Sequence, residues 1–138
     1  MEGKSQIRYV VKKKDLLFPE LSFKVNGVLF GVFKQLGGGH REHIYQKSVA
    51  IGLQNAGIVC REQVYVPLKY QGKMVGKYFL DFLVEERLIL ELKQGQFIPA
   101  HIINQVKQYL SALDFKLALI GCFTHSGVYV KRIVNDPK

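Results

Sequence analysis

The sequence has no tryptophan and few cysteine, methionine or proline residues: two, two and four among 138. Cys60 and Cys122 lie far apart and belong to no CxxC or Cys/His pattern, so neither a disulfide framework nor a zinc site is expected. No apolar run reaches the roughly 18 residues that span a bilayer, and the N-terminus does not resemble a signal peptide. We therefore expect a cytoplasmic protein without a membrane segment.

Acidic residues are also scarce relative to basic ones. The chain has 11 acidic and 20 basic residues, which gives a formal net charge of +9. An excess of this size favours polyanionic partners, above all nucleic acid, although a basic surface can also serve solubility. Hydrophobic residues make up 48% of the chain, enough for a core.

The length suits one compact domain, which we place at residues 19–138. Residues 1–18 differ in composition, because the first 14 residues carry five basic side chains and one acidic side chain. We interpret residues 1–18 as a basic arm that contacts phosphates. A frayed end, or a short strand at residues 7–11, explains this segment equally well.

Hydrophobic spacing predicts the secondary structure. Apolar residues recur every three or four positions over 19–36, 41–55 and 99–113, which indicates three helices. Strand patterns occupy residues 58–68, 74–84, 88–93, 116–123 and 128–134. This order predicts an α/β fold with a central mixed sheet flanked by helices. Within the first helix, the four-residue spacing of Gly27 and Gly31 would let another element approach closely.

The segment from Leu88 to Lys93 carries the most chemical information. Because side chains alternate along a strand, Glu91 and Lys93 share one face. Asp81 is a lone carboxylate in the apolar strand before it, where burial is costly without compensation. If the two strands pair, Asp81 and Glu91 come close enough for a divalent cation to relieve their repulsion. An outer-face Glu–Lys pair, with Asp81 in a surface ion pair, fits the same spacing.

Two motifs resemble a known family. Asp81 followed by Glu91-Leu92-Lys93 resembles the D…(D/E)xK core of the PD-(D/E)XK nuclease superfamily. Residues 39–45, Gly-His-Arg-Glu-His-Ile-Tyr, are similar to the motif of the small GxxExxY proteins of that superfamily. The similarity extends from about Leu21 to Val134 and implies a restriction-endonuclease-like fold.

The resemblance also implies roles for the motif residues. Asp81 and Glu91 would bind Mg²⁺ or Mn²⁺, since hard oxygen ligands suit these ions. Lys93 would assist the attacking water, and Glu42 would be a third carboxylate near the metal, with Tyr45 packing against the sheet and steering it. Glu42 also fits an acid placed in the first turn of a helix by the helix dipole.

A further motif follows in the helix after the strand. Gln105 and Tyr109 resemble the QxxxY motif of related nucleases, whose residues position the substrate phosphate or the catalytic lysine. Their i, i+4 spacing places both on one helix face. Tyr109 fits a core position as well. His40 and His43 flank Glu42, and we interpret both as exposed or substrate-facing residues rather than metal ligands.

These features predict a Mg²⁺-dependent nuclease that hydrolyses phosphodiester bonds, with DNA as the expected substrate. A homodimer would allow both strands of a duplex to be cut. The rival hypothesis is a non-catalytic module that binds nucleic acid or a protein partner on the same fold. The expected contacts to the nucleic-acid backbone come from Lys69, Lys73, Lys77 and Lys107.

Overall fold

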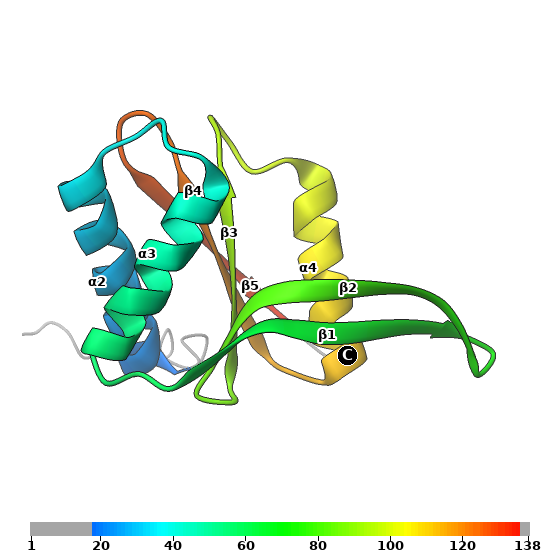
Figure 1. Cartoon of the computed structure of the whole chain (residues 1–138). Helices are drawn as coiled ribbons and strands as arrows, with labels where there is room; N and C mark the ends of the chain where they lie inside the picture. Colours follow the sequence, from blue (N-terminus) through cyan, green and yellow to red (C-terminus); the bar gives the residue numbers. More distant parts are fainter. Residues whose placement is uncertain (1–17, 136–138) are drawn as a thin grey trace, which may run out of the picture.

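The computed structural model describes residues 18–135 (Figure 1), so the proposed basic arm lies outside the described residues apart from Phe18. The predicted order of elements is confirmed, with ends that differ by one or two residues. The elements are α2 (Pro19–Leu36), α3 (Glu42–Asn55), β1 (Cys60–Tyr70), β2 (Lys73–Val84), β3 (Leu88–Gln94), α4 (Ala100–Leu113), β4 (Leu117–Phe123) and β5 (Val128–Val134).

The five strands form one mixed sheet in the order β1-β2-β3-β4-β5. Strands β3 and β4 are parallel, and the other neighbouring pairs are antiparallel. A parallel pair needs a long crossover connection, and α4 supplies it. The expected α/β fold with a central mixed sheet is therefore present.

Helices cover both faces of this sheet (Figure 1). Leu88, Leu90 and Leu92 of β3 pack in the core that includes residues of α2 and α3. Ile89 packs in the second core, which includes residues of α4. Side chains of β3 thus alternate between two buried layers, as the sequence pattern predicts. Among residues 18–135, no helix is long and apolar enough to cross a membrane.

Glycine permits two close contacts of α2 with its neighbours. A Cβ at Gly52 would lie 2.7 Å from Val28 Cγ1, and a Cβ at Gly121 would lie 2.9 Å from Leu29 Cδ1. By contrast, Gly27 and Gly31 have no such neighbour within 4 Å. The close approach that Gly27 and Gly31 would allow is therefore not made among the described residues, because α2 packs on α3 and the sheet through other residues, such as Val28 and Leu29.

Strand β2 leaves β3 part-way along its length. Backbone pairing between them covers only Phe82 to Val84, while β1 and β2 stay paired out to Tyr70 and Lys73. The two strands extend past α4 as a curved ribbon (Figure 1). The ribbon ends in a two-residue turn, Gln71-Gly72, in which both residues have positive φ.

The face that β2 presents changes where it leaves β3. Leu80 packs in the core with α4, whereas Phe82, two residues later, packs in the core with α2 and α3. Opposite this point, Gln63 of β1 has a φ of 51°, an irregularity that breaks simple alternation. Asp81 lies between the two faces, at the fork where β2 and β3 separate.

Candidate active site

The fork between β2 and β3 brings Asp81 and Glu91 together. The Asp81 amide donates to Glu91 Oε2 at 3.0 Å, and the Leu92 amide donates to Asp81 Oδ2 at 2.8 Å. Backbone pairing has ended here, so these two amides would otherwise lack partners in a buried place. Each carboxylate therefore accepts a hydrogen bond from a backbone amide that has no partner on the neighbouring strand.

Both carboxylates are almost fully buried, with exposed fractions of 7% for Asp81 and 8% for Glu91. Burial, followed by the negative charge of Asp81, raises the pKa of Glu91 to about 9. Burial also raises the pKa of Asp81, although the hydrogen bond from the Leu92 amide opposes this. The pair is thus costly to hold with two negative charges. The alternative of Asp81 in a surface ion pair does not fit this burial.

Lys93 lies beyond Glu91 on the same strand and reaches α3. Its Nζ is 3.6 Å from Glu42 Oε1. Glu42 is the first residue of α3, where the helix dipole also favours an acid. Burial raises the pKa of Glu42, Lys93 lowers it and the negative charge of Asp81 raises it again. Glu42 therefore interacts with Lys93 and Asp81, and Glu91 with the same two residues.

A glycine-rich connection fixes the start of α3 and so the position of Glu42. Tyr45 is fully buried and stacks on Phe123 of β4, with ring centroids 4.1 Å apart. Its hydroxyl donates to the Gly37 carbonyl at 2.6 Å and accepts from the His40 amide at 3.3 Å. The expected packing of Tyr45 against the sheet is confirmed.

The same connection packs against the β4–β5 turn. A Cβ at Gly38 would lie 2.7 Å from the Thr124 carbonyl oxygen and 2.8 Å from His125 Cα, so only glycine fits. Gly37 has a φ of 76° and its amide donates to the Phe33 carbonyl, which ends α2. The glycine run thus lets the chain turn tightly from α2 into α3.

The histidines beside Glu42 differ in environment. His43 is exposed, as expected. His40 is half-buried, and its Nε2 lies 2.9 Å from the Leu36 carbonyl oxygen, which requires that nitrogen to carry a proton. Its ring also meets Tyr45 edge-on. The expectation that His40 is an exposed residue was therefore wrong, because its ring packs on the glycine-rich connection; that it is no metal ligand remains a prediction.

Two glutamines complete the surroundings of Asp81, and sequence reasoning missed both. Gln46 of α3 donates to Asp81 Oδ1 at 2.9 Å, and Gln63 of β1 approaches the same oxygen at 3.4 Å. Gln46 follows Glu42 by four residues, so helical spacing could have found it. No sequence signal distinguishes Gln63, because its position depends on the irregularity in β1.

Gln105 and Tyr109 belong to α4, and Tyr109 interacts electrostatically with Glu91 and Asp81. The Gln105 side chain donates to the Tyr109 hydroxyl, as their i, i+4 spacing allows. Tyr109 is buried in the core and meets Tyr78 edge-on. Burial, followed by the negative charge of Glu91, raises the pKa of Tyr109 to about 12. Tyr109 is therefore both a core residue and an electrostatic neighbour of the site.

Comparison with known proteins places this arrangement in a family. The family model described as the PD-(D/E)XK nuclease superfamily matches residues 19–133. The chain belongs to the PD-(D/E)XK nuclease superfamily. Members of this superfamily are generally nucleases and typically use divalent metals. A search of curated protein sequences gave no match.

A solved structure supports the fold assignment. The crystal structure of SSO0001 is similar, with a TM-score of 0.56 and 14% sequence identity. The similarity covers 70% of this chain and 50% of SSO0001, so the chain matches about half the length of that protein. At this identity the similarity shows the fold alone.

The residues of this superfamily member fit a divalent cation, although they do not form a closed cluster. Within residues 18–135, no three acidic, histidine or cysteine side chains are grouped as a ready-made metal site. Asp81 and Glu91 are adjacent, whereas Glu42 pairs with Lys93. Burial raises the pKa of both carboxyl groups, and the negative charge of Asp81 raises that of Glu91 further, so a bound hard cation would offset the cost of keeping both ionised.

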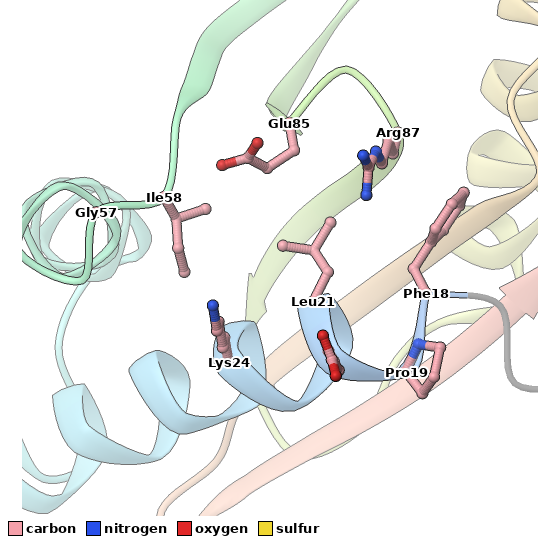
Figure 2. A pocket seen from close by; sticks show the side chains of 9 residues that line it. Phe18, Pro19, Leu21, Lys24, Gly57, Ile58, Glu85 and Arg87 are labelled. Carbon is pink, nitrogen blue, oxygen red and sulfur yellow. The ribbon is translucent and has the colours of Figure 1, made fainter.

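A hollow of about 410 Å³ lies beside the β2–β3 turn, at the other end of β3 (Figure 2). Leu21 and Ile58 project between Lys24, Glu85 and Arg87, so its walls mix apolar groups with charges of both signs. This composition does not favour one class of ligand. The chemically distinctive site of the molecule is therefore the fork and not this hollow.

Proposed function

We propose that this chain is a Mg²⁺- or Mn²⁺-dependent nuclease that hydrolyses phosphodiester bonds in DNA. The observation that carries the proposal is the buried Asp81–Glu91 pair at the fork, with Lys93 two residues further along β3. The superfamily supports nuclease chemistry, and the net charge of +9 supports a polyanionic substrate. Membership of the GxxExxY proteins and a cytoplasmic location remain predictions.

Asp81 and Glu91 would hold the cation, with Glu42 available as a further carboxylate. When bound, the cation would lower the pKa of a water molecule and polarise a phosphodiester oxygen. Gln46 holds the Asp81 carboxylate in place through its 2.9 Å hydrogen bond. Gln46 and Gln63 bond Asp81 Oδ1 and the Leu92 amide bonds Oδ2, so both oxygens of Asp81 are hydrogen-bonded and its orientation is set before substrate arrives.

Lys93 contributes a positive charge next to the carboxylate pair. Its ammonium group would orient the attacking water or offset the charge that develops on the phosphate. The pairing with Glu42 keeps the long lysine side chain near the site before substrate arrives. Gln105 and Tyr109 would help to position the carboxylates. Tyr109 interacts electrostatically with Glu91, and Gln105 donates a hydrogen bond to the Tyr109 hydroxyl.

The test is cleavage of plasmid and of branched or single-stranded DNA, with EDTA, Mg²⁺ or Mn²⁺. We expect cleavage only with a divalent metal, and at least a 100-fold lower rate for Asp81→Asn, Glu91→Gln and Lys93→Ala, since a single preorganised electrostatic group contributes about 10²–10³-fold. Glu20→Gln, an exposed acid in the first turn of α2, should cut as fast as the parent chain.

Equal cleavage by the parent chain and Glu91→Gln would overturn the site assignment. The rival function, a binding module without catalysis, would appear as salt-sensitive DNA binding without turnover at any divalent metal. If the chain cuts both strands of a duplex, we expect it to form a homodimer. Light scattering measures the mass of the species in solution.

A further inference from the structure

We propose that the β1–β2 ribbon is a stacking surface for unpaired nucleotides, which directs single-stranded nucleic acid to the fork. The inference rests on the proposed function only for its last step, the delivery of a strand to the carboxylates. The stacking surface consists of the solvent-exposed aromatic side chains Tyr65 and Phe79 together with Lys69 and Lys77.

The ribbon has an unusual composition for an exposed element. Residues 64–80 contain three lysines and four aromatic residues but no acidic residue. A row of lysines along two strands attracts a phosphate backbone, and the absence of acids leaves this attraction uncompensated. Exposed aromatic rings add a sequence-independent contact, because every base has a face on which such a ring can stack.

One face of the ribbon is covered and the other is open. Val66 and Leu80 are buried in the core with α4, and Tyr78, which pairs with Val66, packs against the same core. The neighbouring pair Tyr65–Phe79 lies on the opposite face, because successive residues alternate. These two side chains are 43% and 49% exposed, although each is large and apolar.

The open face continues outward from this pair, past a register shift between Leu68 and Lys69. The rings of Tyr65 and Phe79 have centroids 5.6 Å apart and are tilted by 55°, so they form one joint platform. The next pair outward is Pro67–Lys77, followed by Lys69. Basic groups therefore follow the aromatic pair along the ribbon, where the phosphates next to a stacked base could lie.

The platform leads directly to the candidate site. Phe79 precedes Asp81 by two residues on β2, a distance of roughly 7 Å along a strand. The cross-strand partner of Phe79, Tyr65, likewise lies two residues from Gln63, which approaches the Asp81 carboxylate. A base stacked on this pair would place its neighbouring phosphate near the carboxylates, whereas a duplex would keep its bases unavailable for stacking.

A protein partner would also cover apolar side chains, but the charge pattern argues against it. Cores of protein interfaces are depleted in lysine, whereas this surface carries Lys77 and Lys69 directly outward of its aromatic pair. Stacking platforms for single strands combine a positively charged track with aromatic rings. The observations therefore favour single-stranded nucleic acid over a protein.

The experiment measures binding of the full chain in EDTA, so that turnover does not contribute. The probes are a fluorescently labelled 20-nucleotide oligothymidylate and a labelled 20-base-pair duplex, followed by anisotropy. Phe79→Ala and Tyr65→Ala should each weaken binding of the oligothymidylate about 5- to 150-fold, the range of a lost base–aromatic stack. Phe79→Tyr should retain binding within about twofold, and duplex binding should change less than twofold in every case.

Controls separate stacking from charge and from exposed apolar area in general. Phe23→Ala on α2, at a residue that is 78% exposed, and Tyr129→Ala on β5, at a residue that is 54% exposed, should leave oligothymidylate binding unchanged. Phe79→Ala should keep the salt dependence of the parent chain, while Lys77→Ala should reduce the slope of log K against log salt by about 0.7.

Unchanged binding of oligothymidylate by Phe79→Ala, or equal losses for single strand and duplex, would overturn the stacking surface. Absence of any binding of the parent chain to oligothymidylate would overturn it as well. Failure of the proposed function is a different result: no cleavage under any metal condition, together with Phe79-dependent binding, would leave the stacking surface intact.

Discussion

At the scale of single residues, Asp81 and Glu91 have two tasks that can be separated experimentally. Each carboxylate accepts a hydrogen bond from a backbone amide. Because β2 and β3 diverge here, this amide has no carbonyl partner on the neighbouring strand. The amide side chains of Asn and Gln keep one acceptor oxygen, so these substitutions retain an acceptor for the backbone amide and remove the charge, while Asn at position 81 turns its NH2 group toward Gln46 and Gln63. Alanine would also leave a buried amide unsatisfied, at a cost of about 1–3 kcal/mol. Asn and Gln variants therefore test charge, and alanine variants mix charge with stability.

The shifted pKa of Glu91 predicts how metal-free stability depends on pH. In the folded chain its pKa is about 9, and in the unfolded chain it is near the ordinary value of 4.5. Between these values the folded state holds a proton that the unfolded state releases. The stabilising contribution of this proton is therefore present at low pH and is lost as pH rises, at up to about 1.4 kcal/mol per pH unit.

We expect Glu91→Gln to gain stability relative to the parent chain as pH rises from 5 to 8 in EDTA. Urea unfolding at several pH values measures the difference in free energy of unfolding. Adding Mn²⁺ should raise the stability of the parent chain more at pH 8 than at pH 5, because protonation of the carboxylates competes less with metal binding as pH rises. Parallel pH curves for the two chains would contradict the assigned pKa shift, and Glu20→Gln is the matched control for loss of an exposed acid.

At the scale of elements, the exposed glycines of α2 weaken the helix without serving a contact. Gly27 and Gly31 have open space where a Cβ would be placed, and neither has a positive φ. Gly27→Ala should therefore raise the free energy of unfolding by about 0.5–1 kcal/mol, the usual difference between glycine and alanine within a helix. Thermal and urea unfolding of the variant measure this gain.

Gly52 is the matched comparison, because it is also a helical glycine but faces Val28 at 2.7 Å. Gly52→Ala should destabilise the chain by about 1–3 kcal/mol, since an added methyl group overpacks the contact between α2 and α3. If both alanine variants changed stability in the same direction and by the same amount, helix propensity alone would explain them. That result would contradict the close contact between Gly52 of α3 and Val28 of α2.

Sequence patterns predicted the elements well because each follows from a local rule. Helical spacing predicted the helices, and Pro19 and the glycine run marked the start and end of α2. Alternation correctly assigned the side chains of β3 to two buried layers. The fork was not predictable in the same way. Alternation along β2 changes face between Leu80 and Phe82, and this change depends on the separation of β2 from β3, which is a tertiary feature.

The candidate site shows the same limit. Motif spacing pointed to Asp81, Glu91 and Lys93, and the structure brings them together at the fork. The glutamines at Asp81 come from α3 and from an irregular residue of β1, so no single segment contains the whole arrangement. Sequence reasoning therefore found the charged residues and missed the neutral side chains that orient them.

At the scale of the whole molecule, positive charge is distributed between the described domain and the N-terminal segment. The full chain has a formal net charge of +9. Residues 1–17 contain five basic and two acidic residues, so their removal would leave a formal charge of +6. Because each phosphate contact contributes separately to the salt dependence of binding, the two contributions can be measured independently.

Deletion of residues 1–17 tests whether this segment contacts phosphates. If it acts as a basic arm, the deletion should reduce the slope of log K against log salt for oligothymidylate by about 2–3, since each lost contact contributes about 0.7. Loss of Phe79 should instead weaken binding at every salt concentration without changing the slope. A variant that replaces Lys12, Lys13 and Lys14 with Gln should reproduce most of the effect at full length. An unchanged slope would show that residues 1–17 are no phosphate-binding arm, and the attraction for nucleic acid would then come from the domain and its ribbon.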